Sequence, residues 1–224
     1  SGFGLASMLE KITGVQTFVE NDANSFILGE WAFGEFKGSQ HMIGLTLGTG
    51  VGGGVITHGI LMTGSSGYGG ELGHTVVEPE GPLCGCGSHG CLESLASATA
   101  IVKMAREYSK RFPKSSMFSA PEITAKVVFD SARGGDLAAT MIVERVTKAM
   151  AIAIGNFIHV FNPEHIIIGG GISKAGDLLI DGILRKMPAF VMPSFIGTYS
   201  ITLSRLVENA GITGAASIVF YRLS

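Results

Sequence analysis

The sequence has little of what marks several common protein classes. Only 15% of the 224 residues are charged, the net charge is −2, and no cluster of lysine and arginine marks a nucleic-acid or membrane surface. The longest apolar stretch, residues 149–161, is short for a membrane span and contains Asn156 and His159. No signal peptide is recognisable. We therefore expect a cytoplasmic, globular protein with no membrane partner.

Cysteine is scarce, and the three that exist lie within eight positions, at Cys84, Cys86 and Cys91. The odd number and the single residue between Cys84 and Cys86 give no disulfide framework. His74 stands ten residues upstream of Cys84. Three thiols and one imidazole from one glycine-rich loop are typical of a structural zinc site, with His89 as a rival fourth ligand. The alternative is three buried free cysteines in a reducing cell.

The cysteine loop ends in Cys91-Leu92-Glu93. A metal that holds Cys91 would fix the start of the following helix and hold Glu93 at the helix N-terminus. His74 could bind the metal through one ring nitrogen and present the other to a ligand. The expected zinc would then organise a polar site without doing chemistry itself.

Glycine is abundant, with 33 residues that cluster at 48–54, 64–73, 85–90 and 169–171. Residues 47–54, LGTGVGGG, formally contain G-x-G-x-x-G, but a strand pattern follows where the dinucleotide fingerprint needs a helix. This segment predicts either a turn that offers backbone N–H groups to phosphate or a plain glycine hairpin. Residues 166–173, IIIGGGIS, predict a second anion cradle or a tight strand–helix turn.

Strand and helix patterns alternate along the chain, which indicates an α/β fold. Strand patterns lie within 41–61, 165–173 and 198–206, and helix patterns lie at 24–36, 93–111, 122–132, 136–161, 175–187 and 211–223. Residues 115–121 are expected to be a loop. Asp22 stands between Asn21 and Asn24 at a strand-to-helix junction, where it is either a helix cap or a functional carboxylate.

Five segments occur in an order that resembles the ROK family, named for repressors, open reading frames and kinases. They are ENDAN (20–24), LGTGVGGGVI (47–56), GGELGH (69–74), CGCGSHGCLE (84–93) and IIIGGGIS (166–173). The stretch CLESLASATAIVKMARE looks most like the bacterial glucokinases of that family. The resemblance implies an actin-like ATPase (ribonuclease H-like) sugar kinase fold. It also implies phosphoryl transfer from ATP, with magnesium, to the 6-hydroxyl of a hexose such as glucose, or of an N-acetylhexosamine.

The resemblance implies roles for particular residues. Asp22 would be the catalytic base, since a carboxylate can accept the proton of a sugar hydroxyl as the phosphoryl group arrives. Sugar hydroxyls would be bound by Asn21, Asp22, Glu71, His74 and Glu93. Zinc would be held by His74, Cys84, Cys86 and Cys91. ATP phosphates would face Thr49 and Gly50, and the adenosine would face Gly169, Gly170 and Gly171. Family members are often homodimers.

One family motif is missing, because no D-x-G-x-T phosphate loop occurs in the 224 residues, and the chain begins without methionine. We therefore expect the chain to start inside the first domain. Residues 1–40 would be the remainder of that domain, 41–208 the C-terminal domain, and 209–224 a helix returning toward the first. Such a chain is expected to transfer little phosphate alone. The alternatives are an inactive fragment, or the sugar-binding part of a ROK repressor, whose DNA-binding helix-turn-helix would precede it.

Overall fold

A five-stranded sheet forms the centre of the computed structural model, which describes residues 4–206 and 210–223. The strands are β1 (Met42–Leu47), β2 (Val51–Thr57), β3 (Ile60–Leu61), β4 (His165–Gly169) and β5 (Ser200–Leu203). Their order across the sheet is β3-β2-β1-β4-β5. The pairs β1–β2 and β2–β3 are antiparallel, whereas β1–β4 and β4–β5 are parallel. The expected α/β class is therefore confirmed.

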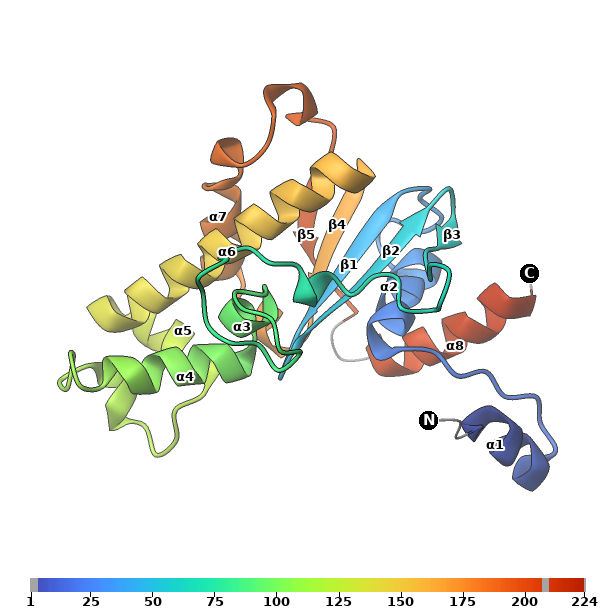
Figure 1. The fold of residues 1–224 in the computed structure, drawn as a ribbon, viewed down its shortest axis with the longest axis horizontal. Coiled ribbons are helices and arrows are strands. Elements are labelled where there is room, and N and C mark those ends of the chain that lie inside the picture. Colours follow the sequence, from blue (N-terminus) through green and yellow to red (C-terminus); the bar gives the residue numbers. More distant parts are fainter. Residues whose placement is uncertain (1–3, 207–209, 224) are drawn as a thin grey trace.

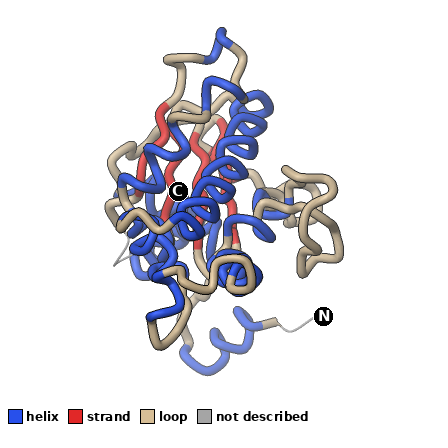
Figure 2. The backbone as a smooth tube through the Cα atoms, turned by 90° about the vertical axis from the view of Figure 1, so that its left-hand side faces the viewer, coloured by secondary structure: helices blue, strands red, loops and turns tan. Residues whose placement is uncertain are grey.

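Helices cover both faces of this sheet (Figures 1 and 2). They are α1 (Leu5–Thr13), α2 (Asp22–Phe33), α3 (Glu93–Ala96), α4 (Ala98–Tyr108), α5 (Ala125–Arg133), α6 (Leu137–Phe161), α7 (Asp177–Leu184) and α8 (Ala210–Leu223). Helices α2 and α8 lie on one side, and α6 with its neighbours lies on the other (Figure 1). Helix α1 lies apart near the N-terminus and buries none of its residues.

The two faces follow from the alternation of side chains along each strand. On β4, Ile166 and Ile168 join the core beneath α6, whereas Ile167 joins the smaller core with Phe26 of α2. On β1, Gly44 faces α2, and a Cβ there would lie 3.0 Å from the side chain of Ile27. Because Gly44 has no side chain on this face, α2 can approach the sheet closely, which brings the N-terminus of α2 beside the strands.

The helix predicted at 93–111 is wrong in one respect, since the structure divides it into α3 and α4. Ser97 between them is extended, with φ −74° and ψ 159°, and its hydroxyl accepts a hydrogen bond from the N–H of Ala100. A serine in this position is a favoured N-cap and starts a new helix. The N–H of Ala98, freed by the break, donates to the carbonyl of Gly48 at 2.8 Å. The break thereby fastens α4 to the glycine segment after β1.

The remaining differences are local. The expected loop at 115–121 contains a short 3₁₀ helix, Ser116–Ser119, and the expected helix at 175–187 is the shorter α7, preceded by the 3₁₀ helix Gly171–Ala175. Helix α5 begins at Ala125, where Thr124 caps it. Among the described residues, no helix is both long and apolar enough to cross a membrane.

The last helix, α8, packs against α2. A Cβ on Gly214 would lie 2.7 Å from the carbonyl oxygen of Ser25, so the two backbones are in close contact. Edge-to-face ring pairs, Trp31 with Tyr221 and Phe33 with Phe220, extend the contact. The proposed division into domains at residues 40 and 208 stays a prediction.

Candidate functional site

Two glycine turns meet at one edge of the sheet, where the parallel strands β1 and β4 end. Thr46 pairs with Gly169 in the ladder, so the segments that follow both strands leave the sheet side by side. Gly170 has φ +86°, and a Cβ there would lie 2.5 Å from the carbonyl oxygen of Leu47. Only glycine fits that position. Ligands of α/β proteins commonly bind at this edge, outside the carboxyl ends of parallel strands.

The first turn, residues 48–50, is held by one hydrogen bond within the turn and one from α4. Within it, the N–H of Gly48 donates to the carbonyl of Gly50 at 2.9 Å. From α4, the hydroxyl of Thr99 donates to the carbonyl of Thr49 at 2.9 Å, while the Thr49 side chain stays exposed. A cavity of about 480 Å³ lies between this turn and the second one, with Thr49 and Gly171 in its lining. Its size is within the range of small-molecule and cofactor sites.

The four expected zinc ligands lie together. The ligand atoms of His74, Cys84, Cys86 and Cys91 are all within 4.8 Å of one another. Nδ1 of His74 lies 3.6 Å from Sγ of Cys84, and the sulfurs of Cys86 and Cys91 are also 3.6 Å apart. Sulfurs bound to one zinc at about 2.3 Å in a tetrahedron are separated by about 3.8 Å. The donor set and its spacing therefore fit zinc. The ring nitrogen in contact with Sγ of Cys84 is Nδ1, and a metal bound there would leave Nε2 of His74 for another partner.

His89, the rival ligand, lies outside this cluster. It is exposed, and its Nδ1 lies 3.2 Å from the carbonyl oxygen of Gly81. The three cysteines form no disulfide. The structure thus favours His74 over His89.

The thiols have different acidities. Burial raises the pKa of Cys91 to about 12 and also raises the pKa of Cys84, whereas a hydrogen bond from the backbone of Ser88 lowers the pKa of Cys86 to about 7. Without a cation nearby, this group therefore holds two thiols in the neutral form. A zinc ion would supply the positive charge that turns all three into thiolates.

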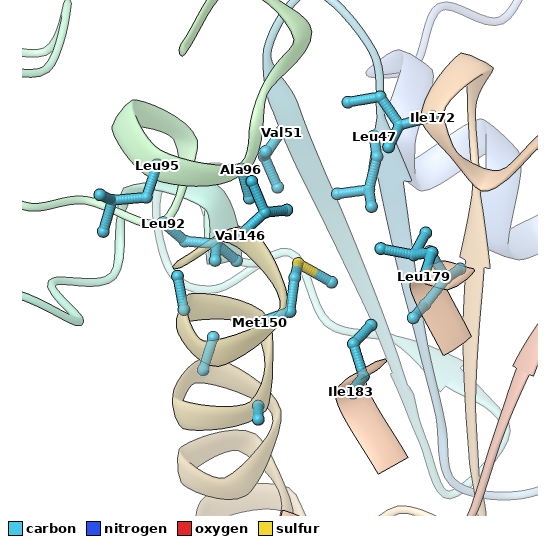
Figure 3. Close-up of a cluster of buried hydrophobic side chains, with 14 of the residues drawn as sticks. Leu47, Val51, Leu92, Leu95, Ala96, Val146, Met150, Ile172, Leu179 and Ile183 are labelled. Atoms are coloured by element: carbon cyan, nitrogen blue, oxygen red, sulfur yellow. The ribbon is translucent and has the colours of Figure 1, made fainter. Parts of the chain in front are cut away.

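Glu93 connects the cysteine cluster with the first glycine turn. It is the first residue of α3, as expected. Its Oε2 accepts a hydrogen bond from the backbone N–H of Val51 at 3.0 Å, and Sγ of Cys84 lies 3.7 Å from Oε1. Leu92 and Leu95 on either side of Glu93 are buried in the cluster that also contains Val51 (Figure 3). One carboxylate therefore touches both sites that the sequence singled out.

Asp22 is the first residue of α2, and it is not the N-cap. The cap is Asn21, whose Oδ1 accepts hydrogen bonds from the N–H groups of Ala23 at 2.8 Å and Asn24 at 3.2 Å. The Asp22 side chain is exposed and lines a cavity of about 670 Å³ together with Thr46 and Gly170. Oδ1 of Asp22 also accepts a hydrogen bond from the N–H of Ala23 at 2.9 Å, so Asp22 supports the start of α2 although Asn21 is its cap. The exposed Asp22 carboxylate lines the cavity beside the second glycine turn.

The glycines of β2 lie between α2 and the segment that carries Glu71 and His74. On one side, a Cβ on Gly52 would lie 2.8 Å from Cβ of Ala23. On the other side, a Cβ on Gly53 would lie 2.5 Å from Cβ of Leu72. Glu71 is exposed, directly before the 3₁₀ helix Leu72–His74. The expected sugar ligands thus surround the glycine-rich strand, although the cavity that Asp22 lines contains neither Glu71, His74 nor Glu93.

Some positioning residues were not found from the sequence. Thr99 holds the first turn, and the N–H of Val51 holds Glu93. Arg145 of α6 pairs with both carboxylate oxygens of Glu78, at 2.9 and 3.2 Å, and so fastens the cysteine loop to α6. Only the Ser97 cap signal could have placed Thr99 at a helix N-terminus, since the other contacts join residues far apart in the chain. Gly169 is buried against the ring of Phe26, so its expected contact with adenosine stays a prediction.

Comparison with known proteins identifies the family. The ROK family model matches residues 1–221. The chain belongs to the ROK family. It is 53% identical over 223 residues to a glucokinase from Thermotoga maritima, covering 98% of this chain and 70% of the relative. ROK repressors match as well: the DNA-binding transcriptional repressor Mlc of Escherichia coli is 32% identical over 214 residues, covering 96% of this chain and 52% of the repressor.

Solved structures of ROK proteins have the same fold. A ROK glucokinase from Streptomyces griseus, in complex with glucose and AMPPNP, superposes with a TM-score of 0.85 at 32% identity, covering 96% of this chain and 71% of that one. A ROK transcriptional regulator homologous to Mlc superposes with a TM-score of 0.86 at 30% identity, covering 97% and 55%. The fold is therefore the actin-like ATPase fold of ROK sugar kinases, as the sequence predicted.

Proposed function

We propose that the protein phosphorylates a hexose, glucose first, at its 6-hydroxyl with ATP as donor. The observation that carries the proposal is the Glu93 carboxylate, which links a Cys3His cluster to a glycine turn at the edge of the sheet. A sugar site and a phosphate site that share one carboxylate suit transfer between the two ligands. The glucokinases among the relatives support the same activity.

The sugar would be bound by a ring of polar side chains. Asn21, Glu71 and Glu93 offer amide and carboxylate groups, and His74 offers Nε2 once its Nδ1 binds zinc. Several hydroxyls pair with such groups at once, and a sugar that lacks one hydroxyl leaves a polar group unpaired, which gives selectivity. Zinc would be structural here, since its four protein ligands leave no open position for substrate.

Asp22 would be the base. As the bond between the 6-oxygen and the γ-phosphorus forms, the bond from that phosphorus to the β–γ bridging oxygen breaks, and the hydroxyl proton passes to the Asp22 carboxylate. Thr49 and Gly50 would face the phosphates, and residues 169–171 the adenosine. Magnesium, bound with ATP, would neutralise charge on the phosphates.

A sugar-sensing role is the second candidate, since Mlc and its homologue match this chain almost throughout. The exposed Asp22 carboxylate, which lines the cavity beside the second glycine turn, favours the kinase, because a sensor has no need for a base. We further propose a cytoplasmic location, which suits three reduced cysteines, and a homodimer, which rests on the family alone.

The test is a coupled assay of ADP release with Mg-ATP and glucose, fructose or N-acetylmannosamine, on the protein as its natural gene encodes it. Glucose should give the highest kcat/KM. Calorimetry on the 224-residue chain measures glucose binding independently. Glucose binding without ADP release for any of the sugars would contradict the kinase and favour the sensor.

Gly50→Ala is expected to weaken glucose binding by several-fold and leave zinc in place. A Cβ at Gly50 would lie close against Oε2 of Glu93, so the carboxylate must move away from the N–H of Val51. Gly48→Ala is the matched control, because a Cβ there meets nothing within 4 Å. Calorimetry with glucose and zinc analysis of both variants check this. Equal glucose affinity in the two variants would show that Glu93 does not contact the sugar.

A further inference from the structure

Lys174 stands where the two cavities at the sheet edge meet. One cavity, of about 670 Å³, is lined by Asp22, Thr46 and Gly170. The other, of about 480 Å³, is lined by Gly48, Thr49 and Thr124. Gly171 and Lys174 are the two residues that line both. Gly171 has no side chain, so among the described lining residues only Lys174 has a functional group that belongs to both cavities.

The backbone of Lys174 is fixed although its side chain is exposed. It belongs to the 3₁₀ helix Gly171–Ala175, in which the hydroxyl of Ser173 donates to the carbonyl of Gly170 at 2.7 Å. Ile172 is buried in the same cluster as Leu47 (Figure 3). Arg133 of α5 donates to the carbonyl of Ala175 at 2.8 Å. The stem of Lys174 therefore starts from a defined point, and its ammonium group can reach either side.

Among the residues that the structure describes, the charges around Lys174 leave its ammonium group without an ion-pair partner. Lys174 is the sole lysine or arginine among the described residues that line the cavity with Asp22. Glu20 in that lining already accepts hydrogen bonds from Arg222 and Asn24. In the other cavity, Lys126 and Asp130 form an ion pair with each other. Lys174 itself forms no ion pair with any residue in 4–206 or 210–223. An unpaired cation between two cavities is suited to an anionic ligand.

We propose that the Lys174 ammonium group binds the phosphates of the donor nucleotide, an inference that rests on the proposed kinase function. A phosphate that faces the turn at residues 48–50 would lie in the smaller cavity, which shares Gly171 and Lys174 with the cavity that Asp22 lines. A lysine is a compact point charge that suits phosphate oxygens. Placed there, it would offset negative charge on the group that moves toward the sugar. Asp22 carries a negative charge of its own, so a nearby cation also keeps the donor phosphate from being repelled.

The experiment compares Lys174→Met, Lys174→Arg and the control Lys148→Met in the protein as its natural gene encodes it. Lys148 is also exposed but lines a cavity beside α6 that contains neither glycine turn. KM for Mg-ATP and for glucose is measured by ADP release, and ATP affinity is measured by calorimetry at low and high KCl. Lys174→Met should weaken ATP binding by about tenfold or more, as for a lost hydrogen bond to a charged group. KM for glucose should change by less than about twofold, because the contact is with the donor.

Two further results are expected. Lys174→Arg should recover most of the ATP affinity, since the charge is kept. The ATP affinity of the wild type should also fall more steeply as KCl is raised than the ATP affinity of Lys174→Met. The reason is that the variant lacks one charged contact that salt can screen. The assignment of Lys174 would be overturned if wild type binds ATP and Lys174→Met binds it with the same affinity. It would also be overturned if Lys148→Met loses as much ATP affinity as Lys174→Met. Either result would leave the kinase proposal standing. A wild-type protein that binds no ATP and releases no ADP would overturn both.

Discussion

Asp22→Asn is expected to lower kcat by about a thousandfold, within the range that general base catalysis supplies, and to leave glucose affinity within a few-fold. The carboxylate is exposed beside the second glycine turn, and Asn21, not Asp22, is the cap of α2. Asparagine keeps an oxygen that can accept the hydrogen bond from the N–H of Ala23, as Oδ1 of Asp22 does. Asparagine keeps the size and one acceptor oxygen but cannot take the hydroxyl proton. Steady-state kinetics with Mg-ATP, and calorimetry with glucose, separate the chemical step from binding.

Asp177→Asn is the matched control for this variant. Asp177 is the first residue of α7, just as Asp22 is the first residue of α2. Both substitutions remove a negative charge from a helix N-terminus, where an acid stabilises by about 0.3–1 kcal/mol. The two variants should lose similar stability, and only Asp22→Asn should lose turnover. Turnover within a few-fold of wild type in Asp22→Asn would reduce Asp22 to a residue that stabilises its helix.

Cys86→Ser is expected to remove zinc and sugar affinity together. The wild-type protein should hold one zinc per chain, because the cluster provides one set of four ligands. Without the metal, the imidazole of His74 and the start of α3 at Glu93 lose their common anchor, and glucose affinity should fall by about tenfold or more, the scale on which outer contacts tune a metal site. The melting temperature should fall as well, because metal binding contributes to folding free energy.

His89→Ala is the control, since His89 lies in the same loop but outside the cluster. Elemental analysis, thermal unfolding and calorimetry with glucose are measured on both variants. Zinc content and glucose affinity should be normal in His89→Ala. A wild-type protein that is free of metal, or one whose melting temperature is unchanged by a chelator, would contradict the zinc site.

The features that could be predicted from the sequence are those set by neighbours along the chain. Three cysteines and a histidine in one short segment lie close together because the segment itself limits their separation, so the cluster could be predicted. The alternation of strand and helix patterns likewise predicted the α/β fold. The break at Ser97 was missed because the surrounding residues are good helix formers, and the deciding contact is from Ala98 to the distant Gly48.

The features that could not be predicted depend on contacts between remote segments. Glu93 accepts a hydrogen bond from Val51, which lies 42 residues earlier in the chain. Lys174 acquires its place between two cavities because β1 and β4 are adjacent and parallel, a pairing that no local pattern encodes. From the sequence, a lysine five residues after Gly169, the last residue of β4, is indistinguishable from an ordinary surface cation. Only the tertiary arrangement shows that no carboxylate in the described part of the chain forms an ion pair with it.

The most direct test of the account is the identity of the product. The protein as its natural gene encodes it is incubated with glucose and Mg-ATP, and the mixture is followed by ³¹P NMR. We expect the γ-phosphate signal of ATP to be replaced by ADP and by a single phosphate monoester on the 6-hydroxyl of glucose. Glucose recovered unchanged, in a protein that calorimetry shows to bind both glucose and ATP, would contradict the proposal that this site transfers phosphate.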